Sequence, residues 1–214
     1  MNTFTVILPH RRNAGNDAAL RICLDCLIAN TVNDFKLIID AAVDQPLYER
    51  VNRMVRQADT EICVYLASDT FVAPSWDVPM LDIYAPDTFV TGVLVEPGAI
   101  GIHPDNVERD FGRKPETFRR AEFEAWCASG EAVVPSGWGW YCPVMYPRDG
   151  YFAFGGLELD LPGDHHGFAP ADVALFDRWL AGGKQIKRAK SYAYHLQRWS
   201  QEDEQTHEKR EMQS

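Results

Sequence analysis

Hydrophobic residues near the N-terminus fall into two alternating patterns. Short, nearly continuous apolar runs at residues 3–8, 35–39 and 62–66 predict three strands. Between them, apolar side chains recur at helical spacing over residues 17–29 and 47–57, which predicts two helices. Strands that alternate with such helices form βαβ units around a parallel sheet, and near-continuous apolar strands indicate that both faces are covered. The pattern predicts an α/β fold with a Rossmann-like, mostly parallel sheet flanked by helices.

The pattern changes in the second half of the chain. Residues 115–130 form a charged helical run, and residues 133–148 form an aromatic segment that is rich in glycine. A further helix is predicted over residues 171–181, because Gly182 and Gly183 follow it and glycine commonly ends helices. The alternation of strands and helices is therefore clearest in the first half.

Length and composition fit one folded domain. The chain has 214 residues, of which 46% are hydrophobic, enough to fill a core. We place this domain at residues 1–200, with a first half at 1–95 and a second half at 96–200. Residues 201–214 are highly charged, which is typical of a frayed helix or a disordered tail.

The charge and the apolar runs restrict the class of protein. The net charge of −10 argues against a broad phosphate-binding surface, although a local basic pocket stays open. No apolar run approaches ~18 residues, the length that a transmembrane helix needs. At the N-terminus the basic residues follow the apolar run, the reverse of a signal peptide. We expect a cytoplasmic protein without an integral membrane segment.

The cysteines agree with that expectation, because their number is odd and their spacing irregular. Cys23 and Cys26 form a C-x-x-C, but they lie in a helical pattern without a second Cys/His pair at ligand spacing. A zinc or redox site is therefore disfavoured. We predict that both are buried structural thiols.

Two carboxylates follow predicted strands at equivalent places. Asp40 ends the second apolar run, and Asp69 follows the third. Ligands of open α/β sheets bind beyond the carboxyl ends of the strands, so both acids are candidates for a nucleotide or metal site. Each could instead cap a turn, since aspartate favours turns and helix starts. Two acids at equivalent strand ends favour the binding site.

The ordered set of motifs resembles the GT-A glycosyltransferases, especially family 2. The first N-terminal motif, TFTVILP, is an apolar strand that ends in Pro and leads into a polar turn. The second, KLIID, is a strand that ends in Asp. The third, VYLASDT followed by FVAPSW, is a strand that ends near an acid before Pro-x-Trp. The C-terminal motifs resemble the Gly-Gly acceptor segment, the Glu-Asp helix start and the closing His strand: FAFGGLELD, PADVALFDRWLAGG and YAYHLQRWS. The set covers most of the chain in the family's order.

The sequence departs from the family pattern at two acids. Ala67 stands at the first acid of the D-x-D motif, so only Asp69 remains there. Ala171 stands at the first acid of the Glu-Asp pair, so only Asp172 remains. The resemblance implies that the retained acids have the more direct roles.

The resemblance implies a metal-dependent transferase that uses a nucleotide-sugar, most simply a UDP-sugar. It implies Asp69 and His195 as ligands of Mn²⁺ or Mg²⁺, which suit carboxylate, imidazole and phosphate. By itself, a histidine among aromatic residues is more often a packing residue. Donor contacts are expected from one set of residues: Pro9, Arg11, Asp40, Ser68, Asp69 and Arg148.

The acceptor hydroxyl needs a general base, and the resemblance implies Asp172 in an inverting reaction. Without the resemblance, Asp172 would be a first-turn acid that complements the helix dipole. Acceptor contacts are expected from a second set of residues: Trp138, Trp140, Gly155, Gly156 and Glu158. The acceptor itself, whether a glycan, a lipid-linked sugar or a nucleic acid base, stays open.

Two other functions stay open at this point. One is a glycosyltransferase that acts on hydroxymethylated bases of phage DNA, which a local basic cluster could support: Arg109, Arg113, Lys114, Arg119 and Arg120. The other is a non-catalytic module that binds a nucleotide-sugar, which Ala67 and Ala171 make plausible. The joint presence of Asp69, Asp172 and His195 favours an enzyme.

Overall fold

The computed structural model describes residues 3–42, 45–98, 106–131, 134, 142–158 and 171–196. In the first half, the elements are β1 (Phe4–Pro9), α1 (Ala14–Asn30), β2 (Phe35–Asp40), α2 (Leu47–Gln57), β3 (Ile62–Tyr65), β4 (Thr70–Val72), α3 (Asp77–Ile83) and β5 (Thr88–Glu96). In the second half, they are β6 (Val107–Glu108), the 3₁₀-helix η1 (Pro115–Thr117), α4 (Arg120–Ala128), β7 (Val144–Pro147), α5 (Arg148–Ala153), α6 (Ala171–Ala181) and β8 (Gln185–His195).

One sheet runs through the molecule in the order β2-β1-β3-β7-β5-β8-β4, with β6 paired to β5. The strands β2, β1 and β3 are parallel, as predicted. β7 is antiparallel to both β3 and β5, while β8 is parallel to β5 and antiparallel to β4. The fold is α/β as predicted, but its sheet is mixed.

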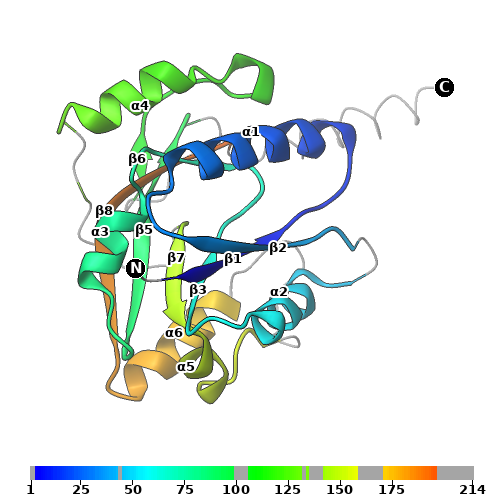
Figure 1. The fold of residues 1–214 in the computed structure, drawn as a ribbon, viewed down its shortest axis with the longest axis vertical. Helices are drawn as coiled ribbons and strands as arrows, with labels where there is room; N and C mark the ends of the chain where they lie inside the picture. The colour runs from blue at the N-terminus through cyan, green and yellow to red at the C-terminus, as the bar shows by residue number, and fades with distance from the viewer. Residues whose placement is uncertain are drawn as a thin grey trace.

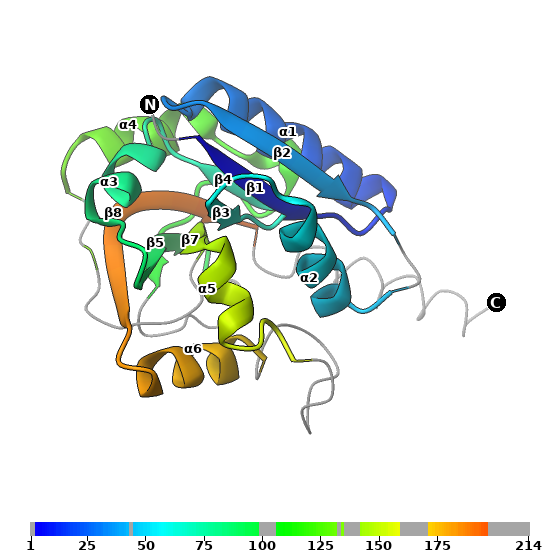
Figure 2. The same ribbon diagram turned by 60° about the horizontal axis from the view of Figure 1, so that its bottom comes forward.

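Helices cover both faces of the sheet (Figure 1). α1, α3 and α4 share one hydrophobic cluster, while α2, α5 and α6 share another on the opposite face. Successive residues of β3 alternate between them, because side chains along a strand point to opposite faces: Val64 joins the first cluster and Tyr65 the second. Figure 2 shows α2, α5 and α6 together on one side. This two-sided burial explains the absence of polar alternation in β1 and β3, whereas β2, at the edge of the sheet, is only partly buried.

The start of α1 differs from the prediction by three residues. The helix begins at Ala14, because the side chain of Asn13 accepts a hydrogen bond from the Asn16 N–H at 2.7 Å and caps it. Cys23 and Cys26, on this helix, are buried and unpaired, as predicted. Among the described residues, no helix has the length and apolar character to cross a membrane.

Strand pairing brings polar residues to one edge of the sheet. Pro9, at the end of β1, pairs with Asp40, at the end of β2. In the antiparallel pair of β4 and β8, Thr70 pairs with His195, so the end of β8 lies beside the turn that holds Asp69. This edge is the carboxyl end of the parallel strands, where ligands of such sheets bind.

Candidate active site

Asp69 and His195 meet at this edge, although 126 positions separate them along the chain. The Leu196 N–H donates to the Asp69 carbonyl at 3.1 Å, which fixes the end of β8 against the turn. His195 Nε2 lies 3.7 Å from Asp69 Oδ2, and the two side chains are 26% and 28% exposed. The pair is therefore held by the backbone and still open to a ligand.

Glu96 completes this cluster and was not predicted. It ends β5, and its Oε1 lies 2.7 Å from His195 Nδ1. The Asn106 side chain donates to the other oxygen at 2.8 Å. The signal was present in the sequence, because Glu96 ends a long apolar run just as Asp40 does.

The charges of this cluster depend on one another. Burial lowers the pKa of His195, but the negative charges of Asp69 and Glu96 outweigh that effect and raise the pKa to about 10. Burial also raises the pKa of Asp69, but the charge and hydrogen bond of His195 outweigh it and hold that pKa below its usual value. Without a bound cation, the protonated imidazole ring stabilises the neighbouring carboxylates.

The chemistry of the pair fits a hard divalent cation. Two adjacent ligands of an octahedral cation such as Mg²⁺ lie about 3 Å apart, so a small approach would bring the Asp69 and His195 atoms, now at 3.7 Å, to one ion. Within the part of the chain that the structure describes, no group of three or more metal-ligating side chains surrounds one point. Two protein ligands suit Mg²⁺ or Mn²⁺, which take remaining ligands from substrate phosphates and water.

Ser68 belongs to a second polar cluster at the same edge. The Ser68 hydroxyl lies 3.2 Å from Nδ1 of the buried His10, whose Nε2 lies 2.7 Å from an Asp17 oxygen. Because a carboxylate only accepts, Nε2 carries hydrogen, and this hydrogen bond to Asp17 fixes the ring that contacts the Ser68 hydroxyl. Ser68 follows Ala67, which stands at the position of the missing family acid.

Asp40 is held by two arginines of α2. Its carboxylate accepts from Arg50 at 3.4 Å, from the Ala42 N–H at 2.8 Å, and from Arg53. Burial raises the pKa of Asp40, but these hydrogen bonds and charges outweigh burial and lower it. Arg11 lies nearby on the exposed segment after β1, where its carbonyl accepts from the side chain of Asn16 at 2.8 Å.

Arg148 lies at the opposite edge of the sheet. β7 runs antiparallel to β3, with Tyr65 opposite Val144 and Ile62 opposite Pro147, so the residue after Pro147 lies at the amino end of β3. There its guanidinium donates to the Ala58 carbonyl at 2.8 Å. Sequence order suggested a donor contact, but the direction of β7 takes this side chain away from Asp69.

Asp172 lies in the first turn of α6, and its charge acts on two of the buried groups that Asp69 also affects. Its Oδ1 accepts from the Val173 N–H at 2.8 Å. Burial raises the pKa of the Tyr65 hydroxyl and of the Cys142 thiol, and the charges of Asp69 and Asp172 raise both further. The charges of both carboxylates therefore act on the same two buried groups.

The Gly-Gly segment is tied to two helices. Gly155 and Gly156 have φ angles of 92° and 67°, which side-chain-bearing residues rarely adopt. From α2, the side chain of Asn52 accepts from the Leu157 N–H at 3.2 Å and donates to the Leu157 carbonyl at 2.8 Å. From α6, the Arg178 guanidinium donates to the carbonyl of Gly156 at 2.8 Å and pairs with Glu158 at 2.7 Å. The segment is thus held between the helix of Asp172 and the helix that binds Asp40.

The remaining expectations concern other parts of the chain. Trp138 and Trp140 lie outside the described residues. Four arginines of the basic cluster contact acids, which reduces the charge that they offer to phosphates: Arg109 with Glu131, Arg113 with Asp110, Arg119 with Asp110 and Glu122, and Arg120 with Glu124.

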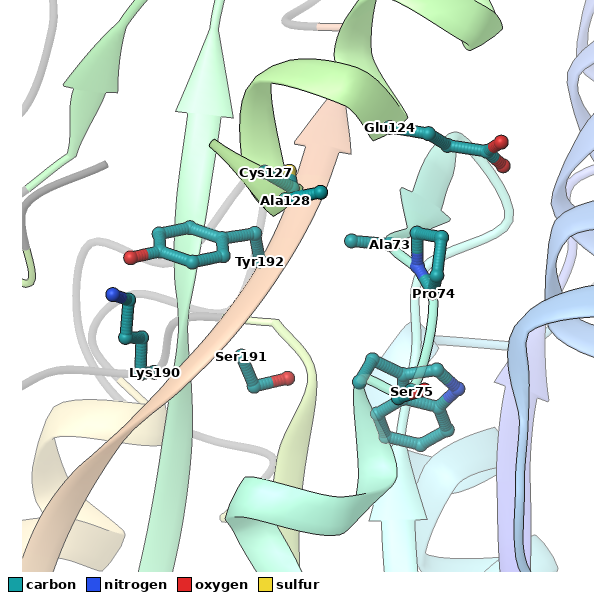
Figure 3. Close-up of a pocket in the computed structure, with 10 residues that line it drawn as sticks. Ala73, Pro74, Ser75, Glu124, Cys127, Ala128, Lys190, Ser191 and Tyr192 are labelled. Carbon is teal, nitrogen blue, oxygen red and sulfur yellow. The ribbon is translucent and has the colours of Figure 1, made fainter. Parts of the chain in front are cut away.

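A separate pocket of about 150 Å³ lies between β8, α4 and the segment after β4. Figure 3 shows Lys190 and Tyr192 of β8 on one side and Pro74 on the other. None of the predicted site residues lines it. It is therefore distinct from the edge that holds Asp69.

Compared by sequence, the chain matches no protein-family model and no curated protein. Compared by structure, it is similar to the catalytic domain of Drosophila β1,4-galactosyltransferase 7 in complex with xylobiose (TM-score 0.55, 11% identity, 88% of this chain and 65% of that chain). It is also similar to GalNAc-T7 with UDP, GalNAc and Mn²⁺ (TM-score 0.54, 12% identity, 91% of this chain and 43% of that chain). A third similar structure is S. aureus TarS in complex with UDP (TM-score 0.55, 11% identity, 91% of this chain and 60% of that chain).

The chain spans less than two thirds of each of these three proteins, and the identities are 11–12%. The likeness therefore concerns the fold. In this chain, helices flank a mixed sheet that carries polar residues at its carboxyl edge. The chain has the GT-A fold of glycosyltransferase catalytic domains.

Proposed function

We propose that this protein is a metal-dependent glycosyltransferase that moves a sugar from a nucleotide-sugar, most simply a UDP-sugar, to a hydroxyl acceptor. The observation that carries the proposal is the pairing of Asp69 with His195 across β4 and β8, with Asp172 close to the same buried groups. The solved relatives support it, because GalNAc-T7 holds UDP and Mn²⁺, TarS holds UDP, and β1,4-galactosyltransferase 7 holds xylobiose.

Asp69 Oδ2 and His195 Nε2 would hold the cation. A bound Mn²⁺ or Mg²⁺ neutralises the charge that develops on the diphosphate leaving group. The protein's own part is to hold the turn of Asp69 against the end of β8 through backbone hydrogen bonds, so that little reorganisation is needed when the donor binds.

The donor nucleotide would lie along the ends of β1, β2 and β3. Asp40, which pairs with Pro9 at the end of the strands, would face the base, and its arginine partners keep it ionised as an acceptor. The Ser68 hydroxyl, oriented by His10, supplies a second acceptor near the missing acid. Arg11, on the exposed segment after β1, would contact the phosphates.

Asp172 would act as general base toward the acceptor, which gives an inverting reaction. The acceptor would lie against Gly155, Gly156 and Glu158, which Arg178 ties to the same helix. This contact places the proposed base and the proposed acceptor segment on one connected unit. The paired arginines of the basic cluster do not favour a nucleic acid acceptor.

Substitution of Asp69 by Asn tests the proposal. The amide keeps the shape but loses the charge that a divalent ion requires, so UDP should bind the variant without dependence on Mn²⁺. Calorimetric titration of UDP with and without Mn²⁺ measures this, and Asp82→Asn, an exposed acid of α3, is the matched control. Unchanged Mn²⁺ dependence in Asp69→Asn would refute the metal assignment. Binding of UDP-sugars without release of UDP would point to a non-catalytic module.

A further inference from the structure

Strand β5 ends in a carboxylate that the protein keeps away from water. The side chain of Glu96 is 6% exposed. Burial of a carboxylate costs free energy unless the group is paired and hydrogen-bonded, so the partners of Glu96 indicate its role. Those partners are the amide of Asn106 at 2.8 Å and the imidazole of His195 at 2.7 Å.

The hydrogen bond to Glu96 determines which nitrogen of His195 is available. A carboxylate only accepts hydrogen bonds, so Nδ1 of His195 must carry the hydrogen. In the neutral ring, the lone pair then lies on Nε2. Nε2 is the atom that faces Asp69, at 3.7 Å.

Asn106 holds the carboxylate in this orientation. Its amide donates to the Glu96 oxygen that His195 does not use, so the two oxygens have different partners. On the backbone, the Arg109 N–H donates to the Glu96 carbonyl at 2.9 Å, which pairs the end of β5 with β6. The carboxylate is therefore fixed through both its side chain and its main chain.

We propose that Glu96 is a positioning residue that fixes the tautomer and orientation of His195, so that Nε2 is presented with Asp69 to the divalent cation. The inference rests on the proposed function, since it concerns the same cation. Carboxylates that accept from the second nitrogen of a metal-binding histidine commonly contribute 10–100-fold to metal affinity. Glu96 itself does not touch the cation.

Substitution Glu96→Gln tests the role with little change in shape. The glutamine amide loses the charge and places either an uncharged acceptor or a donor against Nδ1, and a donor would move the lone pair away from Nε2. Titration of Mn²⁺ into UDP-saturated protein, followed by the electron paramagnetic resonance of free Mn²⁺, should show about 10–100-fold weaker binding.

Glu108→Gln is the matched control, because Glu108 lies on β6 directly opposite Glu96 but is exposed. It should bind Mn²⁺ as the wild-type protein does. A second measurement uses diamagnetic Mg²⁺ with UDP: nitrogen–proton correlation spectra of this complex should show hydrogen on Nδ1 of His195 and none on Nε2.

The outcomes separate this inference from the proposed function. If wild-type protein binds Mn²⁺ and Glu96→Gln binds it equally well, Glu96 is only structural and the inference is wrong, while the metal assignment stands. A lower melting temperature with unchanged Mn²⁺ affinity leads to the same conclusion. If wild-type protein itself binds no Mn²⁺ with UDP, both the metal assignment and this inference fall. Absence of hydrogen on Nδ1 would overturn the inference alone.

Discussion

Asp172→Asn separates a catalytic carboxylate from one that only stabilises a helix. Oδ1 of Asp172 accepts from the Val173 N–H at 2.8 Å. An asparagine oxygen can accept the same bond, so only the charge in the first turn of α6 is lost. That charge is worth about 0.3–1 kcal/mol near a helix N-terminus. For a domain of this size, 1 kcal/mol shifts the melting temperature by about 2–4 °C.

The effect on transfer should be far larger than the effect on stability. The amide cannot accept a proton from an acceptor hydroxyl at neutral pH, and general bases contribute about 10²–10⁴-fold to rate. Donor affinity should be retained, because the proposed ligands of the nucleotide and the cation lie on the other elements: Pro9, Arg11, Asp40, Ser68, Asp69 and His195.

The assay combines three measurements on the same preparation. Melting temperature reports stability, calorimetric titration reports UDP affinity with Mn²⁺, and release of UDP from a UDP-sugar reports turnover. Asp177→Asn is the matched control, because Asp177 is an exposed acid later on the same helix. A lowered melting temperature with normal UDP release in Asp172→Asn would show that Asp172 is only a first-turn acid.

Two further predictions concern residues that connect the halves of the site. Asp40→Asn should cost about 1–3 kcal/mol at neutral pH and weaken UDP binding, because buried Arg50 loses its charged partner. Because the native pKa of Asp40 is lowered, the stability that its charge contributes is complete above the unfolded pKa of 3.8 and is lost as the pH falls through the native pKa. Plots of unfolding free energy against pH for wild type and variant should therefore converge in acid. Parallel plots would contradict this. Asn52→Leu should cost about 1–3 kcal/mol and raise the acceptor KM more than it lowers kcat, because the Leu157 carbonyl loses its donor and the Tyr151 hydroxyl loses its acceptor, while the Leu157 N–H keeps the Tyr151 oxygen. Denaturant unfolding and steady-state kinetics measure both effects, and an unchanged KM would leave Asn52 a purely structural role.

The local sequence determined the first half of the fold. The apolar runs of β1 and β3 require burial on both faces, whereas β2, at the edge of the sheet, is only partly buried. The helical spacing between the three strands requires parallel connections. From that, the sequence predicted that Asp40 and Asp69 follow strands whose carboxyl ends share one edge. Each of these features depends on residues close together in the chain.

The tertiary structure decided which distant residues join that edge. The pairing of β8 with β4 brings His195 to Asp69, and the pairing of β5 with β8 brings Glu96 to His195. The antiparallel direction of β7 sends Arg148 to the opposite edge. An apolar pattern determines that a strand is buried, but it does not determine the strand's neighbours or direction, because those follow from contacts between segments far apart in the chain. The strand ends were therefore predictable from the sequence, whereas the composition of the site depended on the order and direction of the strands in the folded sheet.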